Sequence, residues 1–141
     1  MGASSPLRLI METVFRLSAD SDHLASVRKS LEENLTRAGL KEKPAQELIL
    51  AVNEALANVI RHSYAGKGGE IELYVRNHPD RVEILIREFG KSFDPDKVPL
   101  PQIPPSKPGG LGIFMIRKLT DNCCYTSING VNELLLTKLK S

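Results

Sequence analysis

A group of glycines just before a predicted helix has the composition of a phosphate-binding segment. Gly109, Gly110 and Gly112 surround Leu111, where a helical pattern begins. Glycines there leave backbone N–H groups open at a helix N-terminus, where hydrogen bonds and the helix dipole both favour phosphate. Lys107 adds a positive charge nearby. The Lys-Ser/Thr pair of a P-loop is missing, and a flexible turn explains the same glycines, so the segment is only a candidate.

Three polar side chains share one face of another predicted helix. With about 100° of rotation per residue, Asn58 lies about 40° to one side of Glu54 and Arg61 about 20° to the other. This face is opposite the apolar stripe, so we expect Asn58 to be exposed. Alanines between residues 51 and 57 leave room for another group to approach. A solvated helix face would produce the same pattern, although asparagine is an unusual choice for a helix interior.

A third candidate lies at the end of an apolar strand. Glu88 ends the strand, and Gly90 follows two residues later. A carboxylate at a strand end, beside a glycine that lets a ligand approach the backbone, is a common arrangement in binding sites. Every strand also needs a turn where it ends, so this signal is weak alone.

The elements that position these residues follow from apolar periodicity. Alternation predicts a first strand over residues 7–17, and helical spacing predicts helices near 24–38, with Gly39 as the stop, and 44–62. A hairpin (71–75 and 82–86), a helix near 111–121 and two strands around an Asn129-Gly130 turn complete the order. We predict an α+β fold: a two-layer sandwich with helices on one face of a mixed, mainly antiparallel sheet.

The length of 141 residues suits one domain. We expect residues 1–6 to form an N-terminal tail and residues 7–141 a single domain. Six of the nine prolines lie between residues 95 and 108, a stretch too short to link two domains. Its composition favours a functional loop, and we predict a lid at about 94–110.

Composition excludes several kinds of partner. The chain has 19 basic and 17 acidic side chains, so no strong field attracts nucleic acid or anionic lipid. No apolar run approaches the ~20 residues that span a bilayer, and the N-terminus does not resemble a secretory signal. The two cysteines are adjacent, which favours reduced thiols in a cytoplasmic protein. We therefore expect no direct nucleic-acid binding and no membrane association.

The order of the three candidates resembles the GHKL ATPases, which share the Bergerat fold. Within them the chain is most similar to bacterial anti-sigma factors that are serine-protein kinases, over about residues 7–140. The matching strings are AVNEALANVIRHSY (51–64), FDP (93–95), GLGIFMI (110–116) and the segment 121–132.

This resemblance implies a nucleotide site for ATP and Mg²⁺. Asn58 would ligate Mg²⁺, and Glu54 would be the catalytic residue that orients or deprotonates the attacking serine hydroxyl. Gly90 would pack near adenine, and Gly110 and Gly112 would provide the lid hinge and phosphate contacts. The other nucleotide-binding residues would be Arg61, Glu88, Ser92, Lys107, Gly109 and Leu111.

Two positions depart from the family pattern. Glu88 stands where the family has the aspartate that accepts a hydrogen bond from the exocyclic amine of adenine, and Ser92 stands at a later glycine. The longer side chain of Glu88 could still accept that bond, or it could push the base out. A surface carboxylate at a strand end is an equal alternative.

The resemblance also implies partners. The protein would phosphorylate a serine of an anti-anti-sigma (STAS-type) protein, sequester a sigma factor, and pair as a homodimer. One alternative is a non-catalytic partner-binding module with weak or lost ATP use, which Glu88 would explain. Another is a detached kinase domain of a two-component system, although the sequence contains no pair of phosphoacceptor-histidine helices.

Overall fold

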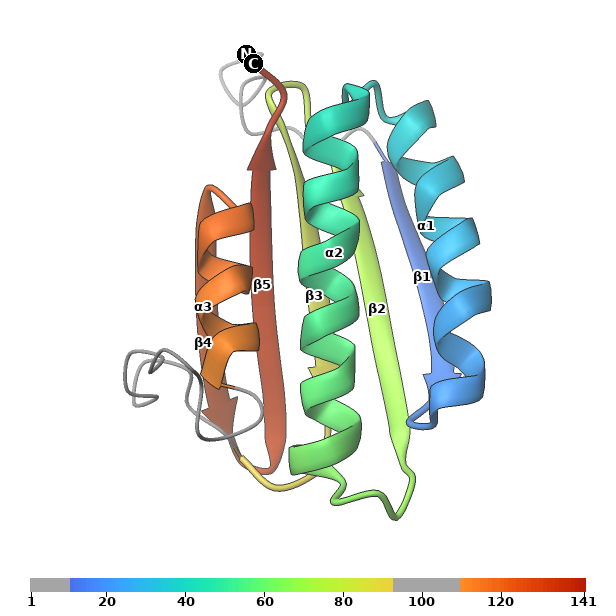
Figure 1. The fold of residues 1–141 in the computed structure, drawn as a ribbon, viewed down its shortest axis with the longest axis vertical. Helices are drawn as coiled ribbons and strands as arrows, with labels where there is room; N and C mark the ends of the chain where they lie inside the picture. The colour runs from blue at the N-terminus through green and yellow to red at the C-terminus, as the bar shows by residue number, and fades with distance from the viewer. Residues whose placement is uncertain (1–10, 93–109) are drawn as a thin grey trace.

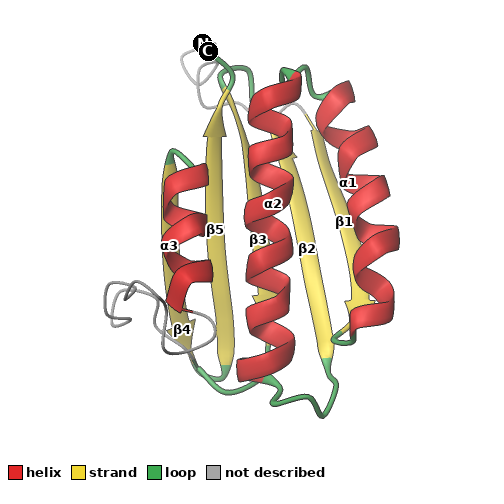
Figure 2. Cartoon of the chain, in the orientation of Figure 1, coloured by secondary structure: helices red, strands yellow, loops and turns green. Residues whose placement is uncertain are grey.

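Among the residues that the computed structural model describes, five strands form one sheet, and three α-helices cover one of its faces (Figure 1). The structure describes residues 11–92 and 110–141. The helices are α1 (Leu24–Arg37), α2 (Glu42–Asn58) and α3 (Gly110–Leu119). The strands are β1 (Met11–Ser18), β2 (Glu70–Asn77), β3 (Arg81–Glu88), β4 (Asn122–Ile128) and β5 (Val131–Leu139). The predicted two-layer α+β sandwich is confirmed, and Figure 2 shows the two layers.

The sheet order is β1-β2-β3-β5-β4, and each of its four described pairings is antiparallel. The sheet is therefore more uniformly antiparallel than the mixed sheet we predicted. Between β3 and β5 the chain passes through α3 and β4, so two strands distant in sequence become neighbours. Their register places Glu88 opposite Asn132 and Ile86 opposite Leu134. The end of β3 that carries the candidate carboxylate is thus fixed beside the start of β5.

The core lies between the sheet and the helices. Alternation along each strand places apolar side chains on the helix-covered face, while ion pairs such as Arg76–Glu12 and Arg87–Glu72 form on the other. Burying each large apolar side chain contributes about 1.5–3 kcal/mol. The largest fully buried side chains come from both layers: Leu31, Leu35, Leu48, Ile49, Val52, Leu56, Ile71, Leu73, Ile84, Ile86, Ile116 and Leu136.

Two local signals predicted from the sequence are confirmed: the glycine that ends a helix and the Asn-Gly turn that joins two strands. Gly39 follows the end of α1 with φ +85°, and the Leu40 N–H donates to the Leu35 carbonyl at 3.2 Å. Asn129 and Gly130 join β4 to β5 with φ values of 53° and 78°. Positive φ at both central residues is the two-residue hairpin turn that Asn-Gly favours, because its twist matches that of the strands.

The helix predicted over residues 44–62 is not α-helical throughout. α2 ends at Asn58, and Val59–Ser63 continue it as a π-helical turn, in which the Tyr64 N–H donates to the Val59 carbonyl at 3.0 Å. A π-turn has more residues than an α-turn, so it rotates the following side chains relative to a regular helix. Such turns are frequent at functional sites.

Part of the predicted organisation lies outside the described residues. This applies to the tail at 1–6, to Lys107 and Gly109, and to all of the predicted lid at 94–110 except Gly110. Within residues 11–92 and 110–141, no helix is both long and apolar enough to cross a membrane.

Candidate functional site

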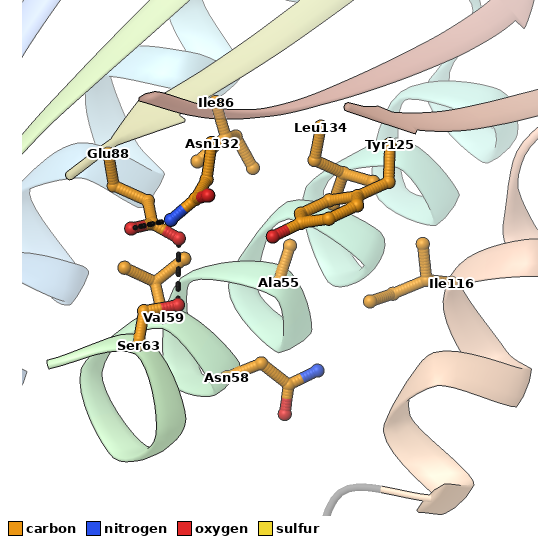
Figure 3. A pocket seen from close by; sticks show the side chains of 10 residues that line it. All are labelled: Ala55, Asn58, Val59, Ser63, Ile86, Glu88, Ile116, Tyr125, Asn132 and Leu134. Atoms are coloured by element: carbon orange, nitrogen blue, oxygen red, sulfur yellow. Dashed lines mark hydrogen bonds between the residues drawn. The ribbon is translucent and has the colours of Figure 1, made fainter. Parts of the chain in front are cut away.

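A pocket lies between α2, α3 and the strands β3, β5 and β4 (Figure 3). Its walls are mostly apolar, and its polar groups come from the end of α2, the π-turn that follows it, the facing ends of β3 and β5, and Tyr125 of β4. The lining residues are Ala55, Asn58, Val59, Ser63, Ile86, Glu88, Ile116, Tyr125, Asn132 and Leu134. Such a pocket, apolar with a few convergent polar groups, is the usual form of a small-molecule site.

Glu88 is the carboxylate of this pocket and is only 3% exposed. Its Oε2 accepts a hydrogen bond from Ser63 Oγ at 2.7 Å. Its Oε1 accepts two, from the Gly90 N–H at 2.8 Å and from Asn132 Nδ2 at 3.0 Å. The alternative of a surface carboxylate is therefore wrong. These donors compensate the desolvation that burial imposes on the charge.

Asn132 connects the carboxylate to β4 and is 1% exposed. Its Nδ2 also donates to the Gly90 carbonyl at 3.0 Å, and its Oδ1 accepts from Ser127 Oγ at 2.6 Å. Because Nδ2 lies between two acceptors, the orientation of the amide is determined. Our sequence reasoning missed Ser63, Tyr125 and Asn132, because the π-turn, the pairing of β4 with β5 and the register of β3 with β5 bring them to the pocket.

Asn58 is 6% exposed, so the expectation that it is an exposed helical amide is wrong. The physical reason is that α3 packs against α2, and Ile116 of α3 lines the same pocket. Asn58 Oδ1 accepts a hydrogen bond from Arg61 Nη2 at 2.9 Å, whereas Nδ2 is buried and has no partner in the part of the chain that the structure describes. A buried amide with an unused donor is costly unless a ligand completes it.

The remaining residues of this helix face lie closer to solvent. Arg61 is exposed, and its Nε donates to His62 Nε2 at 3.3 Å. Burial, and then the Arg61 charge, lower the pKa of His62, so the neutral imidazole that accepts this bond is favoured. Glu54 is half-buried one turn before Asn58 and does not line the pocket that the described residues form.

Gly90 joins the strand end to the π-turn. A Cβ at this position would collide with the backbone carbonyl of Ser63, and that carbonyl accepts the Lys91 N–H at 2.7 Å. The Phe89 N–H donates to Tyr64 Oη at 2.9 Å. Gly90 is therefore required by a protein contact. The next predicted residue, Ser92, is exposed.

The first turn of α3 consists of the predicted phosphate-binding residues Gly110, Leu111 and Gly112. Figure 1 shows this helix starting at the end of the molecule where α2 finishes. The positive end of the α3 dipole and the buried Asn58 amide thus belong to the same region.

Comparisons with known proteins identify the family of this chain. The family model described as "Histidine kinase-like ATPase domain" matches residues 17–138. The serine-protein kinase RsbW of Halalkalibacterium halodurans is 34% identical over 85% of this chain and 78% of the relative. RsbW of Oceanobacillus iheyensis is 30% identical over 82% of this chain and 79% of the relative.

A solved structure shares the fold. The crystal structure of the RsbU and RsbW domains of a Mycobacterium tuberculosis protein superimposes with a TM-score of 0.66 at 19% identity. The match covers 92% of this chain and 32% of that longer chain. The chain therefore belongs to the histidine kinase-like ATPase domain family and, within it, to the serine-protein kinases named RsbW.

Proposed function

We propose that this protein binds ATP with Mg²⁺ in the pocket and transfers the γ-phosphoryl group to a serine of a partner protein. The observation that carries the proposal is a buried, hydrogen-bonded carboxylate, Glu88, in the same mostly apolar pocket as a buried amide, Asn58. The first suits an aromatic base with an amine donor, and the second suits the metal–phosphate end of a nucleotide.

Glu88 would recognise adenine. The apolar side chains of Ile86, Val59 and Leu134 line the pocket and suit the faces of a planar base. An ionised carboxylate has about four acceptor positions, and the protein occupies three at Glu88, which leaves one for the exocyclic amine. The Glu88 side chain is one methylene longer than aspartate, and its Oε1 accepts the N–H of Gly90 two residues later.

Asn58 would hold Mg²⁺ through Oδ1. Mg²⁺ prefers oxygen ligands and usually takes few from the protein, since water and substrate phosphates supply the rest. Within the described ranges no three His, Cys, Asp or Glu side chains form a metal cluster, which fits a single-ligand site. Oδ1 already accepts a bond from the Arg61 guanidinium, so this oxygen suits a cation. The bound metal would neutralise charge on the phosphate oxygens.

Glu54 would act on the attacking hydroxyl. In this proposal its carboxylate would accept the serine proton as the serine oxygen bonds to the γ-phosphorus and the bond to the leaving ADP oxygen breaks. Arg61, released from Asn58, would contact phosphate. The first turn of α3, Gly110–Gly112, would donate backbone N–H groups to phosphate.

The family membership supports the choice of partners. We propose that the substrate is an anti-anti-sigma protein and that the protein, once released from it, sequesters a sigma factor in the cytoplasm. Phosphate on the serine adds about −1.5 to −2 charges, enough to break one complex and release the protein for the other. A non-catalytic module is not favoured, because the relatives are named kinases. Homodimer formation stays a prediction.

Calorimetric titration tests this function. We expect the protein to bind ATP with Mg²⁺ more tightly than GTP, and labelled γ-phosphate to appear on a serine of the partner. Absence of ATP binding at millimolar concentration would refute the nucleotide site. Binding without transfer to any anti-anti-sigma protein of the same genome would refute the kinase assignment alone.

A further inference from the structure

We infer that Ser63 and Asn132 are positioning residues that determine base selectivity, because they hold Glu88 with one acceptor position facing the pocket. The inference rests on the proposed function and deepens it. Neither residue belongs to the sites predicted from the sequence. Both line the pocket, and both bond directly to the Glu88 carboxylate.

The two oxygens of Glu88 are used unequally. Oε1 accepts from both the Gly90 N–H and Asn132 Nδ2, so its two lone-pair positions are filled. Among the described residues, Oε2 accepts only from Ser63 Oγ. The remaining acceptor position is therefore on Oε2.

The carboxylate cannot turn without losing buried hydrogen bonds. Asn132 Nδ2 is fixed between Glu88 Oε1 and the Gly90 carbonyl, and Ser127 Oγ holds the other end of the amide. Ser63 approaches from the opposite side, so the two dashed bonds to Glu88 in Figure 3 meet it from different elements. Rotation would leave buried donors unpaired, which is unfavourable in a site shielded from water.

Ser63 owes its place to the π-turn. The turn buries Ser63, while its neighbour Arg61 is exposed. The Ser63 carbonyl accepts the Lys91 N–H, and the missing side chain of Gly90 allows this contact. Ser63 is thus held at its carbonyl and its hydroxyl, and the end of α2 is coupled to the base-recognition group.

This arrangement has a direct consequence for selectivity. A single free acceptor matches the exocyclic amine of adenine. Guanine presents a carbonyl oxygen at the same position, so two acceptors would face each other in a buried site. If the carboxylate were mobile, it could turn away from guanine. The clamp formed by Ser63 and Asn132 therefore enforces the discrimination.

Glu88→Gln tests the clamp, because it should replace the free acceptor that faces the pocket with a donor. The Gly90 N–H and Asn132 Nδ2 both need an acceptor, so the new amide must place its oxygen at the Oε1 position. Its NH₂ group then lies at the Oε2 position, donates one hydrogen to Ser63 Oγ and presents the other to the pocket. We expect the ATP:GTP affinity ratio to fall at least about ten-fold, or 1.4 kcal/mol.

Two further variants act on the clamp itself. Ser63→Ala should lower the ATP:GTP affinity ratio about ten-fold with little change in GTP affinity, and Ser26→Ala, on the exposed face of α1, is the matched control. Asn132→Asp places a second carboxylate beside Oε1 of Glu88, and like charges disfavour the state in which both carboxylates are ionised. As pH rises from 6 to 9 this repulsive state becomes populated, so the ATP affinity of the Asn132→Asp variant should fall. Wild type and the exposed control Asn122→Asp should show no such slope.

The outcomes separate this inference from the proposed function. If wild type binds no nucleotide, the proposed function fails. If wild type prefers ATP but all three variants keep its ATP:GTP ratio and pH profile, the clamp alone is refuted. Equal losses for ATP and GTP would also refute it, because a merely structural role lowers both. Circular-dichroism melting of each variant confirms that the comparison is made on folded protein.

Discussion

At the scale of single residues, the burial of Asn58 makes its substitution informative about both the stability of the protein and its binding of Mg²⁺ and ATP. Asn58→Ala removes a buried donor that no described residue pairs with, together with the bond to Arg61, and these effects on folding oppose each other. We expect the free energy of unfolding to change by less than about 1 kcal/mol. Mg²⁺-dependent ATP binding should be lost in calorimetry. Asn53→Ala on the same helix is the control, and a large stability loss in Asn58→Ala would make Asn58 structural.

Arg61 should compete with the metal for the same oxygen. In Arg61→Ala, Asn58 Oδ1 loses its guanidinium partner and a nearby positive charge disappears. We expect half-maximal ATP binding at a lower Mg²⁺ concentration than in wild type, while ATP binding in EDTA weakens because a phosphate contact is lost. Titrations of both kinds, with the exposed Arg37→Ala as control, check this. An unchanged Mg²⁺ midpoint would contradict the competition.

A substitution of Glu54 should abolish phosphoryl transfer while leaving ATP binding intact. Glu54→Gln keeps the shape of a half-buried side chain but cannot accept the serine proton. We expect ATP affinity to stay within about two-fold of wild type, well under the ten-fold that corresponds to 1.4 kcal/mol. Phosphoryl transfer to the partner should be lost in a radiolabel assay. Full transfer would exclude Glu54 as an essential base, and the exposed Glu33→Gln serves as control.

At the scale of elements, the contact of the β3 end with the π-turn should matter even without ligand. A Cβ in Gly90→Ala would meet the Ser63 backbone carbonyl, which cannot move aside like a flexible side chain. We expect destabilisation of about 1–3 kcal/mol, typical of overpacking, in nucleotide-free thermal unfolding. Lys91→Ala is the adjacent control. If Gly90→Ala lost ATP binding but kept its stability, the glycine would serve only the ligand.

The sequence predicted these elements because their signals are local. Alternation in β2 and β3, Gly39 after α1 and the Asn129-Gly130 turn each report on a few neighbouring residues. The burial of Asn58 and the contact of Glu88 with Asn132 depend on tertiary packing and on strand register. A helical wheel cannot represent α3 covering α2, nor the π-turn that directs Ser63 inward. The sequence therefore singled out two of the residues that line the pocket, Asn58 and Glu88, and missed Ser63 and Asn132, whose positions depend on tertiary packing.

At the scale of the whole molecule, Lys138 links the sheet to two helices. This residue of β5 is mostly buried, and its Nζ donates to the Leu119 carbonyl at the end of α3 at 2.7 Å. The same Nζ forms an ion pair with Glu47 Oε1 of α2 at 3.1 Å. Since α3 also supplies Ile116 to the pocket wall, Lys138 supports the site from the opposite end of that helix.

Lys138→Met should test this link, because methionine keeps the apolar stem and removes the charge. The Leu119 carbonyl would lose its donor, while Glu47 could turn to solvent, so we expect destabilisation of about 1–3 kcal/mol in thermal unfolding. ATP affinity should fall as well, since α3 loses an anchor while no pocket-lining residue has changed. The exposed Lys29→Met is the matched control. Wild-type stability together with wild-type ATP affinity would show that α3 is held by its apolar contacts with α2 alone.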